Sequence, residues 1–154
     1  MTKTKNRGRD ERLYYNTGTH ASPSWVWMKR TINRTVSLGK GEINFQDQES
    51  DWEKTLGAAK KLGLQFGYRE KISAADSVFA AIWDSYLNGT PIEIAAMAGN
   101  IATSGVKGFR AFIEVMELEQ TAELEGMTEW SVSVKLTEHE EAGSIVEPDR
   151  YTVP

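Results

Sequence analysis

The chain has 154 residues, 18 of them Lys or Arg and 22 Asp or Glu, and no cysteine. That length predicts one domain, and the cysteine count excludes a disulfide framework and thiolate chemistry. No apolar run approaches the roughly 20 residues of a membrane-spanning helix, and no apolar core follows the basic first ten residues, so we expect neither membrane insertion nor a signal peptide.

Charge is spread unevenly along the chain. Residues 1–12 carry five basic and two acidic side chains, whereas residues 109–154 carry three basic and eleven acidic ones. A basic beginning and an acidic final third fit head-to-tail contact between copies, and they fit two solvated surfaces equally well.

Residues 1–24 are polar and rich in Gly, Ser, Thr and Asn, which predicts an extended amino-terminal arm. Leu13, Tyr14 and Tyr15 form an apolar cluster inside it. We expect this cluster to dock either on its own domain or on a neighbouring copy. A weakly ordered arm is the third interpretation.

The segment Trp25–Leu38 alternates imperfectly and is rich in Trp, Val, Ile and Thr, which predicts one long strand. Trp25 and Trp27 are candidates for interface or core anchors. A turn at Gly39–Gly41 and a short strand over Glu42–Gln46 are expected next. Residues 47–61 then predict a long polar loop that carries Trp52, with a helical turn near Trp52–Lys60.

The segment Leu62–Glu70 alternates cleanly, with Leu62, Leu64, Phe66 and Tyr68 on one face, and predicts a strand. A helix is expected over about 73–88. Ser73 and Asp76 have capping-box spacing, and Gly89 can end the helix in a left-handed conformation. Its apolar stripe consists of Val78, Phe79, Ile82, Trp83 and Tyr86.

Three further strands are expected over Pro91–Ala98, Phe109–Leu118 and Trp130–Leu136. The fold class is therefore mainly β (α+β), an antiparallel β-sandwich or barrel with one flanking helix. The domain organisation is an arm over 1–24, a β-sandwich domain over 25–136 and a C-terminal tail over 137–154.

Catalytic and metal-binding constellations are weak throughout. His20 and His139 lie in polar segments that we expect to be exposed, and neighbouring residues in Glu138–Glu141 point apart on an extended chain. No phosphate-binding glycine motif and no nucleophile motif is present in the sequence. We expect no enzymatic activity, no metal and no cofactor.

Several stretches carry a resemblance to a known family. They are the Ser50–Trp52 loop, the helix Ala75–Tyr86 with the following Asn88–Ile94, the strands Gly108–Val115 and Glu129–Leu136, and the ending Pro148–Val153. In this order, residues 25–154 resemble the major tail tube proteins of bacteriophages with long non-contractile tails, in a superfamily with type VI secretion tubes. The long charged loop and the length of the basic arm depart from the pattern.

The resemblance implies a virion protein that assembles in the host cytoplasm. Six copies would form a ring whose inner sheets join into a β-barrel, and rings would stack into a hollow tail tube. Implied partners are other copies, a tape-measure protein, terminator and tip proteins, and DNA in transient, non-specific passage.

Two sets of residues are candidates for roles in such a tube. Acidic strand residues would line the lumen and repel DNA phosphates, namely Glu114, Glu117, Glu119 and Glu129. Contacts between subunits or rings are expected from Leu13, Tyr14, Tyr15, Trp25, Trp27 and Trp52.

Two alternatives stay open. One is the inner tube of a contractile tail or type VI-like secretion apparatus, with nearly the same fold. The other is a monomeric ligand-binding β-barrel, which requires a closed apolar interior.

Overall fold

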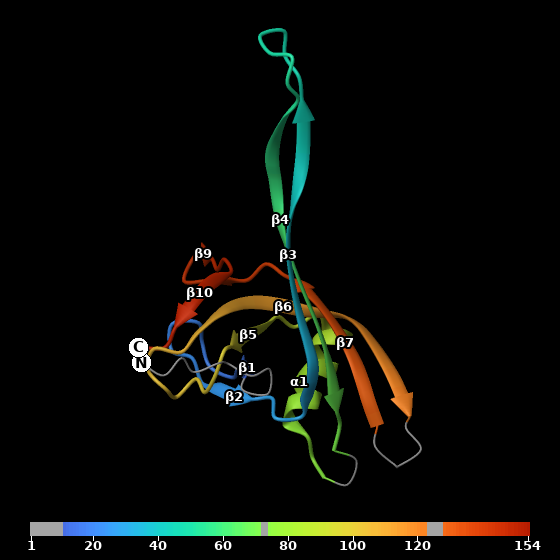
Figure 1. Ribbon diagram of the computed structural model, residues 1–154. Coiled ribbons are helices and arrows are strands. Elements are labelled where there is room, and N and C mark those ends of the chain that lie inside the picture. Colours follow the sequence, from blue (N-terminus) through green and yellow to red (C-terminus); the bar gives the residue numbers. More distant parts are fainter. Residues whose placement is uncertain (1–10, 72–73, 123–127) are drawn as a thin grey trace, which may run out of the picture.

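The computed structural model describes residues 11–71, 74–122 and 128–154. An antiparallel sheet dominates it and one helix flanks the sheet in the described part (Figure 1). The sheet contains β1 (Arg12–Asn16), β2 (Trp25–Trp27), β3 (Thr31–Phe45), β4 (Lys54–Arg69), β5 (Ile92–Met97), β6 (Lys107–Ala122), β7 (Thr128–Leu136) and β10 (Asp149–Thr152). The helix is α1 (Ser77–Asn88), and β8 (Glu140–Glu141) pairs with β9 (Ser144–Ile145) as a separate ribbon. The predicted mainly β, α+β class is confirmed.

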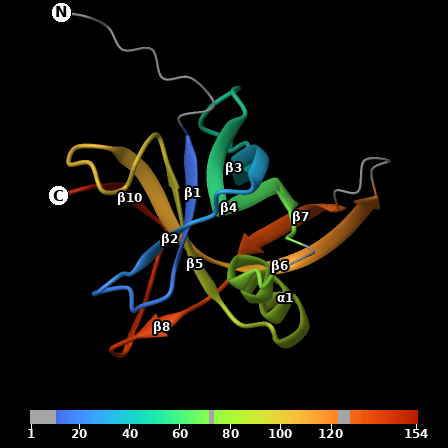
Figure 2. The same ribbon diagram turned by 90° about the horizontal axis from the view of Figure 1, so that it is seen from below.

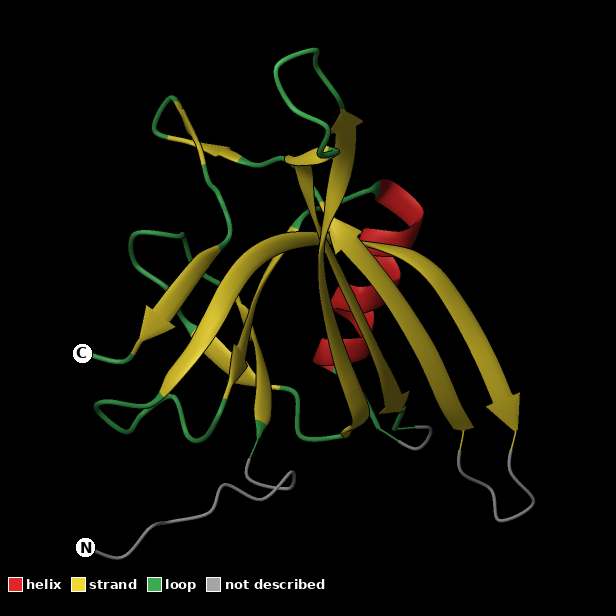
Figure 3. Cartoon of the chain, turned by 45° about the horizontal axis from the view of Figure 1, so that its top comes forward, coloured by secondary structure: helices red, strands yellow, loops and turns green. Residues whose placement is uncertain are grey.

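The strand order is β2-β1-β5-β6-β7-β4-β3, with β10 also paired to β6. The long strand β6 is shared between two halves of the sheet. Its first half pairs with β5 and β10, and its second half pairs with β7. As Figure 3 shows, β6 arches over the body, so one sheet folds into the two layers of a sandwich. The sheet stays open in the monomer, because β2 and β3 end the strand order without pairing to each other.

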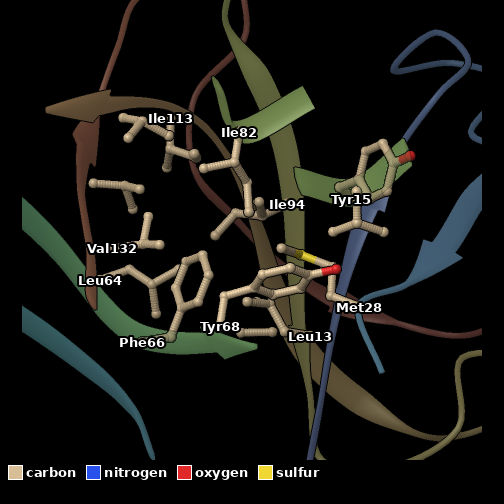
Figure 4. Close-up of a cluster of buried hydrophobic side chains, with 14 of the residues drawn as sticks. Leu13, Tyr15, Met28, Leu64, Phe66, Tyr68, Ile82, Ile94, Ile113 and Val132 are labelled. Carbon is tan, nitrogen blue, oxygen red and sulfur yellow. The ribbon is translucent and has the colours of Figure 1, made fainter. Parts of the chain in front are cut away.

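The hydrophobic core fills the space between the two halves of the sheet (Figure 4). The alternation predicted for β4 is confirmed, since Leu62, Leu64, Phe66 and Tyr68 are all buried. They meet Val132 of β7 and side chains from β1, β5, β6 and α1. Each fully buried aliphatic side chain of this kind contributes about 1.5–3 kcal/mol to stability.

Helix α1 lies beside β6 (Figure 2). Its N-cap is Asp76, whose side chain accepts a hydrogen bond from the N–H of Phe79. The expectation that Asp76 accepts a hydrogen bond in the first turn is confirmed, and the helix begins at Ser77, later than the expected residue 73. Ser73 lies outside the described residues. Gly89 ends the helix at φ 67°, as predicted.

The buried face of α1 differs in part from the predicted stripe. Val78, Phe79 and Ile82 are buried, but Trp83 and Tyr86 are exposed and a small polar residue, Ser85, is fully buried. Ser85 lies on the side of the helix that faces β6, where its hydroxyl accepts the N–H of Val115 at 3.1 Å. Although Trp83 is exposed, its ring stacks on the ring of Phe79, with ring centroids 6.3 Å apart.

Three local predictions between residues 25 and 61 are wrong. The single strand Trp25–Leu38 is divided into β2 and β3, and β3 then runs through the expected turn at Gly39–Gly41. Lys54 to Lys61 belong to β4, so the expected loop 47–61 and its helical turn reduce to a connection over 46–53. Cross-strand pairing explains these corrections. β2 pairs with β1, whereas β3 pairs with β4 from Thr31 opposite Tyr68 to Phe45 opposite Lys54.

Both ends of the described chain join the sheet. The segment expected as an arm contributes β1, which pairs with β2 on one side and β5 on the other. The C-terminal tail contributes β10, which pairs with β6. Among the described residues, no helix is long and apolar enough to cross a membrane.

Candidate assembly surfaces

The β3–β4 hairpin projects well beyond the body of the molecule (Figure 1). Its outer part is exposed on both strands, and apolar side chains lie opposite each other there: Ile43 faces Leu56 in the register. Phe45 and Trp52 are also exposed, Trp52 at 79%. An isolated two-stranded hairpin is only marginally stable in water, so this hairpin is suited to packing against another surface.

The outer half of β4, Lys54–Leu62, is unpaired on the side away from β3, because β7 pairs with β4 only from Gly63 on. Two more long strand edges are unpaired within the described part of the chain. One is the outer edge of β3, the last strand in the order. The other is the edge of β6 beyond Ile113, where β5 no longer reaches and β7 pairs on the opposite side. At the start of this second edge, the hydroxyl of Ser85 accepts the N–H of Val115 at 3.1 Å. Unpaired edges of this length are sites for strand addition by another chain.

The four acidic residues proposed for a lumen share one face of the sheet, the face turned away from the core. Glu114 lies opposite Lys135 in the register, and Glu117 and Glu119 lie opposite serines of β7. Glu129 lies opposite Arg69 of β4. Two of the carboxylates therefore face a cation across the ladder, whereas Glu117 and Glu119 do not, and both of these are exposed. The negative potential of this acidic face is concentrated at Glu117 and Glu119.

The residues expected to contact other subunits occupy different environments. Leu13, Tyr14 and Tyr15 are buried in β1 within their own subunit, which is the first of the interpretations given above. The hydroxyl of Tyr14 also accepts the N–H of Ile101 at 3.2 Å. A residue buried this way supports the sheet and offers little surface to a second copy.

The tryptophans are more accessible. Trp25 is partly buried against Tyr151, with ring centroids 6.2 Å apart. Trp27 is 37% exposed, and the guanidinium of Arg12 lies 3.9 Å from the centroid of its ring. Trp27 and Trp52 therefore remain available for contact between copies.

Sequence reasoning missed a polar cluster on the face of β5 and β6 that points away from the main core. Glu93 is 3% exposed, accepts the side-chain N–H of Asn16 at 2.9 Å and lies 3.7 Å from the guanidinium of Arg110. It also contacts Nδ1 of His20. Arg110 donates to the carbonyl of His20 at 2.6 Å. The cluster ties the loop after β1 to the centre of the sheet.

The C-terminal segment closes over the same cluster. Glu141 accepts the backbone N–H of His20 at 3.0 Å, and this hydrogen bond holds the pKa of Glu141 below its usual value. The ring of His139 stacks on Phe112 at 3.9 Å between centroids. His20 and His139, expected to be exposed, are thus half-buried. A charged residue inside the apolar run Ile92–Met97 was the sequence signal for this cluster.

The cluster has a structural role. In the described part of the chain, no group of three or more His, Asp or Glu side chains could hold a metal ion. Its carboxylates and cations are engaged with each other and with backbone groups. The arrangement anchors the loop after β1 and the segment of His139 and Glu141 to β5 and β6.

Comparison with known proteins rests on structure. No family model matches the sequence. No curated protein matches it either.

Solved structures match over nearly the whole chain. The SPP1 tail tube subunit has a TM-score of 0.71 at 16% identity, covering 96% of this chain and 80% of that one. A subunit in the tail of a gene transfer agent particle has a TM-score of 0.65 at 13% identity, covering 92% and 98%. A chain in the sheath–tube complex of an extracellular contractile injection system has a TM-score of 0.62 at 8% identity, covering 98% and 94%.

These structures share the arrangement described above over more than nine-tenths of the chain. At identities of 16% and lower, the similarity shows a shared fold and does not assign the roles of individual residues. The chain has the fold of the tail tube proteins of phages, gene transfer agents and contractile injection systems.

Proposed function

We propose that this chain is a structural virion protein whose copies form hexameric rings that stack into a hollow tail tube. The tube holds a tape-measure protein during assembly, is closed by terminator and tip proteins, and conducts DNA into the host. Assembly takes place in the host cytoplasm. The observation that carries the proposal is the match to tail tube subunits over 92–98% of the chain.

The open sheet supports the proposed ring. Each neighbouring pair in β6-β7-β4-β3 is antiparallel, so the first and last of these four strands run in opposite directions. The free edge of β6 on one copy can therefore accept the free edge of β3 on the next as another antiparallel pair. Repetition of this head-to-tail contact closes into a ring when the rotation per copy divides a full turn. In this ring, the acidic face lines the bore.

The exposed hairpin and tryptophans supply the proposed contacts between rings. Trp52 at the end of the hairpin is suited to an adjacent ring, and Trp27 to a neighbouring copy. Leu13, Tyr14 and Tyr15 act indirectly, by holding β1 in the sheet. A truncation that tests the role of the arm must therefore stop at residue 10, since the loss of β1 would open the core.

A contractile-type tube is the second candidate. The similarity to the contractile injection system chain, with a TM-score of 0.62, is close to that of the gene transfer agent tail at 0.65. The two candidates share the tube and differ in whether a sheath surrounds it. Co-expression with the sheath protein of the same particle, followed by co-purification, distinguishes them.

The monomeric ligand-binding barrel lacks its main requirement, because the sheet is open in the monomer. The experiment that tests the tube is negative-stain electron microscopy of the purified chain together with its elution volume on a sizing column. Rings or hollow tubes are expected. A 17.2 kDa monomer at every concentration, with and without added tip complex, would contradict the proposal.

A further inference from the structure

The connection between β3 and β4, residues 46–53, is acidic throughout. It carries Asp47, Glu49, Asp51 and Glu53, with no Lys or Arg among its eight residues. Trp52 is exposed and stands between Asp51 and Glu53 in the sequence. The connection is held in shape from within, since the Gln46 side chain donates to the carbonyl of Asp51 at 3.3 Å and the N–H of Trp52 donates to Ser50 Oγ at 3.2 Å. We call residues 46–53 the hairpin tip.

A pocket with a basic rim lies at the other end of β3. Its volume is about 380 Å³, within the range of pockets that hold a small organic group. Arg12, Trp27, Lys29 and Arg34 are among its lining residues, and we call these four the basic pocket. The Arg12 guanidinium and the Lys29 ammonium lie 3.9 Å and 5.5 Å from the centroid of the Trp27 ring.

The two cations on Trp27 form no ion pair within the described part of the chain. Arg34 forms an ion pair with Glu11 at 3.0 Å, but neither Arg12 nor Lys29 forms an ion pair with any described residue. Two cations that have no ion-pair partner among the described residues, placed around a half-exposed indole, make a surface that attracts carboxylates and aromatic rings together. The hairpin tip offers this combination.

A copy cannot place its own tip in its own pocket. Thr31 and Phe45 are the first and last residues of β3, and at about 3.3 Å per residue they lie roughly 46 Å apart. Figure 1 shows the tip at the top of the hairpin and β2 at the opposite end of the body. The partner for the tip is therefore a second copy, and the contact is head-to-tail.

We propose that the Trp52 tip of each copy docks in the basic pocket of a copy in the next ring. The tip carboxylates compensate Arg12 and Lys29, and the Trp52 indole packs against Trp27. This inference rests on the proposed function and gives the tube its direction of stacking. It also makes the axial repeat depend on the span from pocket to tip within one copy, of which β3 alone contributes up to about 46 Å.

Cysteine crosslinking tests the contact directly, because the chain has no cysteine of its own. Asp51→Cys in the tip and Lys29→Cys in the pocket are both exposed replacements. Oxidised tubes of the double variant are expected to run as a ladder of covalent oligomers on a non-reducing gel. Each single variant is expected to stop at monomer or dimer. Tubes that assemble but yield no ladder overturn the inference and leave the proposed function standing.

Charge reversal provides an independent test. Asp51→Lys with Glu53→Lys, and separately Lys29→Glu, are each expected to raise the concentration needed for assembly about tenfold, which corresponds to about 1.4 kcal/mol. Combining all three is expected to restore assembly at least in part. Glu138→Lys, an exposed reversal elsewhere, is the control and is expected to leave assembly unchanged. Loss without rescue in the combined variant contradicts the pairing, and a wild-type chain that forms no rings or tubes overturns both proposals.

Discussion

The hydroxyl of Tyr68 donates to both carboxylate oxygens of Asp76, at 2.8 Å and 2.9 Å. Tyr68 lies in the core strand β4, and Asp76 caps α1, so this contact fixes the start of the helix on the sheet. Burial opposes ionisation of Asp76, but the N–H of Phe79, the Tyr68 hydroxyl and the N–H of Lys71 all donate to the carboxylate. Their sum keeps the pKa of Asp76 below its usual value.

The Asp76 cap predicts an acid-sensitive helix. Because the folded pKa is lower than the unfolded value of about 3.9, the ionised cap stabilises the fold above that pH and the gain is lost as pH falls through the folded pKa. Asp76→Ala is expected to lower the free energy of unfolding by about 0.5–2 kcal/mol at pH 6 and by less near pH 2. Urea unfolding of the variant and the unchanged chain at both pH values measures this loss in the free energy of unfolding. Equal losses at the two pH values would assign the effect to packing instead of charge.

Ser85 forms a buried hydrogen bond between α1 and β6, so its removal is expected to destabilise the fold. Ser85→Ala leaves the N–H of Val115 without its partner, at an expected cost of about 1–3 kcal/mol. The same change at Ser77, exposed in the first turn of the same helix, is the matched control and is expected to cost less. Hydrogen exchange gives a second measurement, because the Val115 amide is expected to exchange faster in the Ser85 variant alone. An unchanged Val115 exchange rate would contradict the assignment.

The backbone of β5 lies so close to Gly108 that we expect this position to tolerate no side chain. A Cβ there would lie 2.2 Å from the carbonyl oxygen of Ala96 and 2.8 Å from Cα of Met97, both backbone atoms of β5. Gly108→Ala is expected to cost about 3 kcal/mol or to prevent folding, since β5 and β6 would have to separate. Gly39→Ala is the control, because a Cβ at Gly39 meets nothing within 4 Å. Soluble yield and thermal unfolding compare the two, and similar behaviour would contradict the predicted steric cause.

The acidic face predicts how the tube treats DNA. Glu117→Lys with Glu119→Lys reverses the two carboxylates that have no cation opposite them. If this face lines the bore, tubes of this variant are expected to retain short duplex DNA at low salt and release it as salt rises. Glu138→Lys with Glu140→Lys makes the same charge change at two exposed residues outside the acidic face and is expected to retain less. Equal retention by both variants would place the acidic face outside the bore.

Local sequence patterns predicted part of this structure well. The alternation Leu62–Tyr68 predicted the buried face of β4, because side chains of a strand point to opposite sides in turn. Gly89 predicted the end of α1, because few other residues adopt φ 67° without strain. Both predictions depend on neighbours along the chain.

Other features depended on partners far away in sequence. The segment Gly39–Gly41 forms a strand and not the expected turn, because it pairs with β4. Local propensity contains no information about this pairing. Likewise, nothing in the sequence connects Glu93 with Arg110. The two side chains lie close together because β5 and β6 pair side by side.

By itself, the sequence determined a mainly β chain with a flanking helix and an uneven charge, since periodicity, turn residues and composition are local properties. Tertiary structure alone decided that Tyr15 pairs with Ile94 and is buried, and that the hairpin carries Trp52 away from the body. The physical reason is that strand pairing joins segments many residues apart, and the apolar face of each strand is buried only when the whole sheet has formed.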